Sequence, residues 1–168
     1  MPLTPLHLGG GLFLGSLNRR FFSLWALLLG SVVMDIEPTI LLLINPCYSC
    51  PHHGFFHSIL GAIVGSAILA TILSKHQEKL KEISLNIFKY KSIHPFSFKV
   101  LFFSALSGWL IHIFFDSLTH FDVFLFWPLK SNPIFISPKI YWPLNLILLL
   151  LGIFGLLLLR KKIKKNEI

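Results

Sequence analysis

The chain has 168 residues, of which 54% are hydrophobic and only 13% are charged, a composition far outside that of soluble globular domains. Its net charge of +8 comes from short basic runs that flank apolar segments, which is typical of membrane topology signals and not of a nucleic-acid surface. These features exclude an ordinary soluble enzyme, give no reason to expect a nucleic-acid partner, and predict an all-helical, polytopic membrane protein.

The first two apolar stretches are short. Residues 6–17 contain four glycines and are the weakest candidate for a membrane span. Residues 21–34 form the second stretch, which runs into Asp35-Ile36-Glu37-Pro38. Because proline disfavours the helical conformation at the residue before it, we expect the helix to end here, with both carboxylates at its C-terminal end.

Three longer apolar stretches follow. Residues 55–73 and 100–118 would each form a helix of about 28 Å, close to the hydrocarbon thickness of a bilayer, and residues 144–159 precede a basic run. The sequence therefore predicts a transmembrane bundle of four to five spans in a single domain, residues 1–168. We expect residues 75–99 to be a basic cytoplasmic connector with an amphipathic surface helix, and residues 160–168 to be a basic cytoplasmic tail.

Five spans would place every Lys and Arg except Lys130 and Lys139 on one side of the membrane. The positive-inside rule assigns that side to the cytoplasm, so we expect the N-terminus outside and the C-terminus inside. The opposite side then receives ten His, Asp and Glu residues: His7, Asp35, Glu37, His52, His53, His57, His112, Asp116, His120 and Asp122. This clustering depends on residues 6–17 crossing the membrane.

His112 and Asp116 are four residues apart, so they share one face of a helix. An imidazole and a carboxylate on one face can bind a divalent metal. The alternative is a buried His–Asp hydrogen bond that joins helices.

Three further histidines, His52, His53 and His57, stand at the mouth of a span. They could be interfacial histidines without a ligand, but together with Asp35 they favour a metal site. Carboxylates at a helix C-terminus meet the negative end of the helix dipole, and a bound cation would remove that conflict.

The remaining polar residues are weaker candidates. His7 fits a metal ligand or a lone interfacial histidine equally well, and His120 and Asp122 are expected to orient the ligands. Cys47 and Cys50 have metal-ligand spacing, but a disulfide or two free thiols fit equally well. The chain has no serine-hydrolase elbow and no His-Glu-x-x-His helix.

Four elements in chain order resemble the YdjM-like family of inner-membrane metal-dependent hydrolases, over roughly residues 5 to 130. They are His7-Leu-Gly-Gly, Asp35-Ile-Glu37, His52-His-Gly-Phe-Phe-His57-Ser58, and Gly108-Trp-Leu-Ile-His112-Ile-Phe-Phe-Asp116-Ser-Leu-Thr119 followed by Pro128. The family pattern has Asp at position 37 and Arg at position 53, where this chain has Glu37 and His53. Loss of the guanidinium would weaken recognition of phosphate or carboxylate.

Taken together, the residues and the resemblance predict a membrane-bound hydrolase that acts on an ester or phosphoester, possibly lipid-linked, at the outer face of the inner membrane. We expect one or two divalent ions, with zinc the first choice, and a coordinated water as nucleophile. The expected metal ligands are His7, Asp35, His52, His57, His112 and Asp116, with Glu37 or Asp122 transferring the proton. The alternatives are a non-enzymatic metal-binding carrier or scaffold, and an adaptor that acts through the basic connector and tail.

Overall fold

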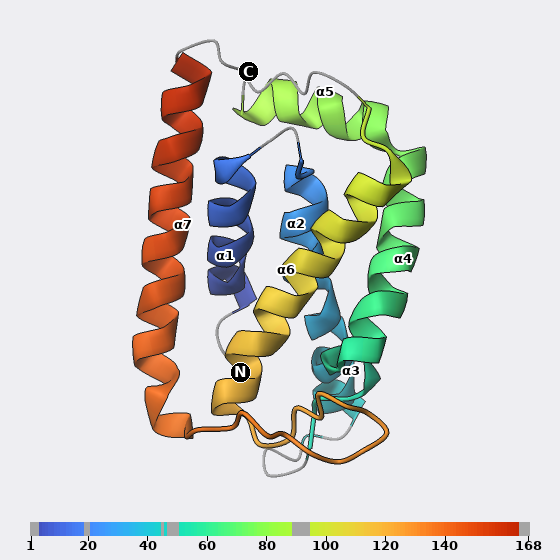
Figure 1. Ribbon diagram of the computed structural model, residues 1–168, viewed down its shortest axis with the longest axis vertical. Helices are drawn as coiled ribbons and strands as arrows, with labels where there is room; N and C mark the ends of the chain where they lie inside the picture. Colours follow the sequence, from blue (N-terminus) through green and yellow to red (C-terminus); the bar gives the residue numbers. More distant parts are fainter. Residues whose placement is uncertain (1–3, 19–20, 45, 47–50, 89–94, 165–168) are drawn as a thin grey trace.

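The structure is a computed structural model that describes residues 4–18, 21–44, 46, 51–88 and 95–164, all of them helical or in turns and loops (Figure 1). Three single 3-10 turns, η1 (Val33–Asp35), η2 (Phe55–His57) and η3 (Pro138–Ile140), interrupt the helices. The helices are α1 (Thr4–Leu17), α2 (Leu24–Gly30), α3 (Ile36–Ile44), α4 (Ile59–Lys75), α5 (Gln77–Phe88), α6 (Phe98–Thr119) and α7 (Tyr141–Lys164).

Helix α6 crosses the centre of the bundle obliquely and packs against both α2 and α4 (Figure 1). Helix α1 lies between α7 and the α2–α6 pair. Helix α5 turns away from α4 by 76° and lies across one end of the bundle, beside the last turns of α7. Helix α3 and the loop after α6 lie at the other end of the bundle, away from α5.

Within the described ranges, three helical stretches are long and apolar enough to cross a membrane: Leu24–Ile44, Phe98–Thr119 and Pro138–Lys164. A fourth crossing is counted if α4 and α5 form one bent span. The all-helical membrane bundle is therefore confirmed. The fifth predicted crossing has no support from length, because α1 has only 14 residues.

The predicted helix end at Asp35 is wrong. Helix α2 already ends at Gly30, and a new helix, α3, begins at Ile36 and continues to Ile44. Pro38 falls in the first turn of α3, where its missing N–H leaves no hydrogen bond unmade. The carboxylates of Asp35 and Glu37 therefore stand at the favourable, N-terminal end of a helix dipole, and the conflict expected from a C-terminal position does not arise.

Helices α1 and α7 approach each other closely at a glycine contact. A Cβ atom at Gly9 would overlap the carbonyl oxygen of Leu148, and a Cβ atom at Gly152 would lie 3.1 Å from the Cα of Gly9. At the far end of α1, the Lys162 ammonium group donates hydrogen bonds to the carbonyls of Ser16 (2.7 Å) and Leu17 (3.0 Å). Helix α7 thus holds the short α1 in place along its length.

Trp109 of α6 fixes the segment that leads into α4. Its ring is buried against Gly65, and its indole N–H donates a 2.8 Å hydrogen bond to the carbonyl of Phe56. The Ser58 hydroxyl then accepts a 3.0 Å hydrogen bond from Gly61 N–H and caps α4. These contacts set the position of His57, which lies between the two anchored residues.

Candidate metal centre

His112 and Asp116 lie one turn apart on α6 and are 99% buried. The Nε2 of His112 is 3.0 Å from Oδ2 of Asp116, and its Nδ1 is 2.7 Å from the carbonyl oxygen of Ser31. A carbonyl can only accept, so Nδ1 carries the proton in this contact. In the neutral imidazole, Nε2 then has a free lone pair that points at Asp116.

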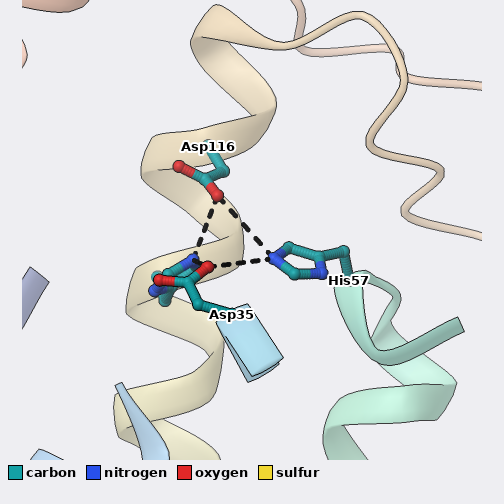
Figure 2. Close-up of side chains that lie close together, drawn as sticks. Asp35, His57 and Asp116 are labelled. Atoms are coloured by element: carbon teal, nitrogen blue, oxygen red, sulfur yellow. Dashed lines mark hydrogen bonds and ion pairs between the residues drawn. The ribbon is translucent and has the colours of Figure 1, made fainter. Parts of the chain in front are cut away.

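Two further side chains meet this pair. The Oδ1 of Asp35 lies 3.2 Å from Nε2 of His112 and 3.6 Å from Nε2 of His57, which is itself 3.8 Å from Oδ2 of Asp116 (Figure 2). One ligand atom from each of the four residues lies within 4.8 Å of the other three. Zinc binds N and O ligands at about 2.0–2.2 Å, which places the ligands of a tetrahedral ion about 3.3 Å apart. The four atoms are therefore spaced as ligands of a single divalent ion.

Glu37 holds the outer side of the His57 ring. Its Oε2 is 3.4 Å from Nδ1 of His57 and accepts hydrogen bonds from Gly54 N–H (3.2 Å) and Phe56 N–H (3.1 Å). Burial lowers the pKa of His57, but hydrogen bonding to Asp35 and Glu37 outweighs it and leaves that pKa raised. Metal-binding histidines commonly have such a carboxylate on the ring nitrogen that faces away from the metal.

Asp122 plays the same part for His53. Its Oδ2 lies 2.9 Å from Nδ1 of His53 and accepts the backbone N–H groups of His52 (2.8 Å) and His53 (3.2 Å). Burial raises the pKa of Asp122, but the hydrogen bond with the His53 ring and its charge outweigh burial and hold that pKa well below its usual range. The other ring nitrogen of His53, Nε2, lies 3.8 Å from Oδ2 of Asp116.

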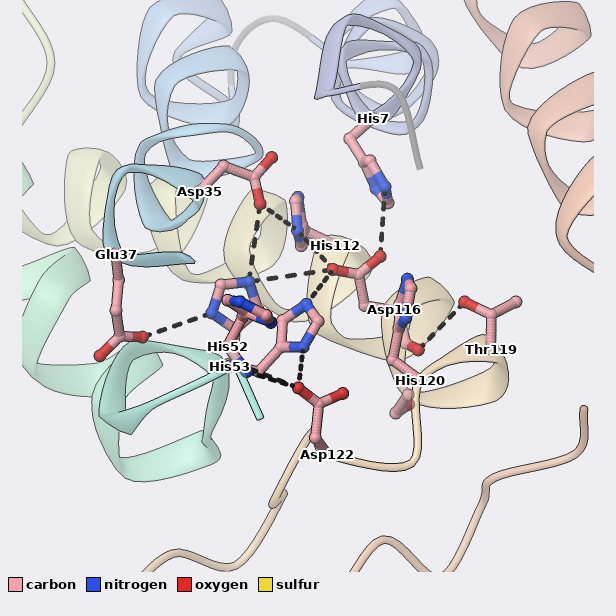
Figure 3. Close-up of polar contacts among 12 residues, drawn as sticks. His7, Asp35, Glu37, His52, His53, His112, Asp116, Thr119, His120 and Asp122 are labelled. Atoms are coloured by element: carbon pink, nitrogen blue, oxygen red, sulfur yellow. Dashed lines mark hydrogen bonds and ion pairs between the residues drawn. The ribbon is translucent and has the colours of Figure 1, made fainter. Parts of the chain in front are cut away.

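His7 and His120 complete the cluster (Figure 3). The Nε2 of His7 lies 3.4 Å from Oδ1 of Asp116, and its ring stacks on that of His112 at a centroid distance of 3.9 Å. The ring of His120 lies 4.9 Å from the ring of His53, and burial lowers the pKa of His120 to about 4. His120 is therefore neutral at physiological pH, the state in which imidazole binds metal.

Several polar atoms of the cluster are buried without a hydrogen bond among the described residues. They include Nε2 of His57, Nε2 of His7 and Oδ1 of Asp116. Buried polar atoms in proteins nearly always have a partner, so such a concentration calls for an explanation. Lone pairs of imidazole and carboxylate are the donors that zinc and similar divalent ions take, so the residues fit a metal.

The structure brings together five of the six residues predicted from the sequence as metal ligands: His7, Asp35, His57, His112 and Asp116. His52 reaches the cluster through its backbone N–H and lies outside the four-residue group. Cys47 and Cys50 fall outside the described residues.

Sequence reasoning undervalued two side chains, His53 and His120. His53 is one of the three histidines that favour a metal site in the sequence, but the expected ligand set omits it and the family pattern has an arginine at its position. His120 was placed among the orienting partners, although it follows Asp116 by four residues, the same spacing that separates His112 from Asp116.

Fold and site together define a polytopic helical membrane protein with a buried His–Asp cluster at one end of its bundle. The model of the YdjM inner membrane protein family matches residues 3–167, nearly the whole chain. The chain therefore belongs to the YdjM inner membrane protein family, as its motifs indicated. Neither the curated proteins nor the solved structures gave a match.

Proposed function

We propose that this protein is a membrane-bound, divalent-metal-dependent hydrolase that acts on an ester or phosphoester of a lipid or lipid-linked substrate. Asp35, His57, His112 and Asp116 would hold the ion, and zinc suits this set of nitrogen and oxygen donors. The activity, the metal and the substrate are all parts of the proposal.

One observation carries the proposal. His57 and His112 each direct Nε2 toward the two aspartates, while Nδ1 of each ring meets an outer acceptor, Glu37 or the Ser31 carbonyl. A structural His–Asp hydrogen bond would require only one such pair. Each ring is held by an acceptor at Nδ1 and directs Nε2 at the same two carboxylates, which is the arrangement of preorganised metal ligands.

A divalent ion in such a site lowers the pKa of a coordinated water to about 7 and polarises a phosphoryl or carbonyl oxygen. Hydrolysis would then form a bond from the water oxygen to phosphorus or carbon, break the bond to the alcohol oxygen and transfer a proton to that oxygen. Glu37 is the proposed proton carrier, because its carboxylate touches His57 and is 19% exposed. Asp122 is the second choice, because its side chain is only 9% exposed.

A groove beside the cluster supports a lipid substrate. Its volume is about 380 Å³ and its walls are apolar, with Met34, Ile40, Phe56 and Trp109 among them. The only charged residue among its lining residues is Glu37, which also contacts His57. An acyl or isoprenoid chain in this groove would place its polar headgroup near the carboxylate and the proposed metal ligands.

The first test is the metal content of the detergent-purified protein by elemental mass spectrometry. We expect at least one zinc or manganese ion per chain, lost in the His112→Ala and Asp116→Ala variants. His76→Ala is the matched control, because His76 is exposed at the other end of the bundle, with its ring bonded to the carbonyl of Ile72. Wild-type protein without metal after reconstitution would refute the proposal.

The second test incubates metal-loaded protein with membrane lipid extracts and analyses the products by mass spectrometry. We expect released headgroups or phosphate that require both the metal and Glu37, with Glu82→Gln on the exposed face of α5 as control. Absence of metal-dependent products would reject the hydrolase part of the proposal.

A metal-stabilised scaffold is the second candidate, and the burial of the site favours it. His57 is fully buried, His112 and Asp116 are 99% buried, and Asp35 is only 14% exposed. Under this alternative, chelation would lower the Tm of the purified protein while Glu37→Gln would leave its cellular function intact. Under the hydrolase proposal, Glu37→Gln would remove function even at a zinc concentration that keeps the site occupied.

A further inference from the structure

The two carboxylate oxygens of Asp116 differ in their histidine contacts: His112, His57 and His53 approach Oδ2, and His7 approaches Oδ1. The Oδ2 atom is directed at the proposed site, 3.0 Å from Nε2 of His112 and 3.8 Å from Nε2 of His57. The Oδ1 atom makes no hydrogen bond to a described residue and lies 3.4 Å from Nε2 of His7. The first ion of the proposed function would therefore bind only one of the two oxygens of this buried carboxylate.

His7 provides the strongest sign of a second ligand. Its side chain is 0% exposed, and neither of its ring nitrogens makes a hydrogen bond. Stacking on His112 fixes the plane of the ring and leaves Nε2 directed at Oδ1 of Asp116 (Figure 3). A histidine kept only for packing would be replaceable by an apolar ring, whereas this one places two bare nitrogens in the protein interior.

His53 and His120 offer two further free nitrogens in the same region. Asp122 contacts Nδ1 of His53, which leaves the buried Nε2 of that ring without a hydrogen bond to a described residue. This Nε2 lies 3.8 Å from Oδ2 of Asp116, the oxygen that also faces the first site. The Nε2 of His120 is likewise buried without a partner, and Figure 3 draws this ring next to Asp116, on the side away from Asp35. Three imidazoles from α1, from the loop before η2 and from the end of α6 thus surround one carboxylate.

We propose a second divalent-metal site formed by His7, His53, His120 and Oδ1 of Asp116, with Asp116 bridging the two ions. The inference rests on the first metal site of the proposed function. Three imidazole nitrogens and one carboxylate oxygen are a donor set suited to zinc. A pair of ions that share a carboxylate can bind both the attacking and the leaving oxygen of a phosphoester, which favours phosphoesters over carboxylic esters as the substrate class.

The test counts ions. Metal-free protein in detergent is titrated with Zn²⁺, excess ion is removed, and zinc per chain is measured by elemental mass spectrometry. We expect two ions in the wild type, one in His120→Ala and two in the His76→Ala control. The ring of His120 is only partly buried, so its removal should leave the bundle folded.

Each count has one meaning. Zero ions in the wild type would refute the proposed function itself, whereas one ion would refute only the second site. Two ions in both the wild type and His120→Ala would show that the second ion binds elsewhere and would overturn this ligand assignment.

A spectroscopic measurement on the unmodified protein tests the second site without depending on whether a variant folds. With Mn²⁺ as the probe, two ions bridged by Asp116 should give the exchange-coupled electron paramagnetic resonance spectrum of a dinuclear centre. A spectrum of isolated Mn²⁺ at a loading of two ions per chain would overturn the bridging role of Asp116.

Discussion

At the scale of single residues, the buried polar side chains of the bundle differ in how well they are satisfied. The Ser104 hydroxyl donates to the carbonyl of Val100 at 2.6 Å and accepts the N–H of Ser23 at 2.9 Å, so it joins α6 to the start of α2. The Ser66 hydroxyl, on α4, is equally buried but makes no hydrogen bond to any described residue. The same residue type therefore stabilises the protein in one helix and destabilises it in another.

Replacing these two serines by alanine should change stability in opposite directions. Ser66→Ala removes an unsatisfied buried hydroxyl and should increase the free energy of unfolding by about 1 kcal/mol. Ser104→Ala leaves the Ser23 N–H without its acceptor and should decrease that free energy by about 1–3 kcal/mol. Thermal unfolding of both variants in the same detergent measures the difference, and equal shifts would contradict the hydrogen-bond assignment.

The carboxylate of Glu37 gives a second prediction at this scale. In Glu37→Gln the amide keeps one acceptor oxygen but loses the charge opposite Nδ1 of His57. Loss of such an outer partner lowers metal affinity by about 10- to 100-fold. Competition with a fluorescent zinc chelator measures this affinity, with Glu82→Gln as control. Unchanged affinity would mean that Glu37 has no part in orienting His57.

At the scale of helices, the site depends on how closely α2 and α6 pack. A Cβ atom at Gly108 would overlap the carbonyl of Leu27 and lie 3.1 Å from Ser31 N. Ser31 is also the residue whose carbonyl anchors the ring of His112. The smallest residue on α6 therefore faces the segment that orients a proposed metal ligand.

Gly108→Ala should both destabilise the bundle and weaken the metal site. Because the added methyl meets backbone atoms that cannot rotate away, we expect a loss of about 1–3 kcal/mol in stability together with reduced zinc content. Gly10→Ala is the matched control, since the atoms nearest to its methyl would belong to the side chains of Ile111 and Leu148 and not to the backbone. Equal effects of the two substitutions on zinc content would disprove a specific role for the α2–α6 contact.

The hydrophobic pattern and the segment lengths predicted the apolar helices α2, α4, α6 and α7 and the amphipathic helix α5, because these features depend on local sequence. The break between α2 and α3 was missed, since Pro38 fits the first turn of a new helix as well as the end of an old one. His112 and Asp116 could be paired from helical spacing alone. The approach of His53 and His7 to Asp116 depends on the packing of loops and helices far apart in the chain, which spacing does not encode.

At the scale of the whole molecule, the bundle has one end that carries the buried His–Asp cluster and one basic end. Helix α3 and the loop after α6 lie at the first end, and α5 with the last turns of α7 lie at the second (Figure 1). The basic residues of the second end include Lys79 and Lys81 on α5 and three lysines in the last turn of α7. Positive charge beside membrane spans favours the cytoplasmic side, so we expect the cluster to face outward.

Single-cysteine labelling tests this orientation. In a chain whose Cys47 and Cys50 are replaced by serine, a membrane-impermeant maleimide should label Ser131→Cys in spheroplasts. It should label Glu78→Cys only after permeabilisation, since both positions are exposed but lie at opposite ends of the bundle. The reverse pattern would place the cluster in the cytoplasm.

The contact between α1 and α7 has a consequence for biogenesis. During synthesis α1 emerges first of the described helices and α7 emerges last, yet α7 is its main neighbour and Lys162 closes its C-terminal end. His7 can therefore reach its final position beside Asp116 only after every other described helix has been inserted. The complete cluster would then form only after the last described helix has been inserted. A ribosome-stalled chain that lacks α7 would enter the bilayer without His7 in its final position.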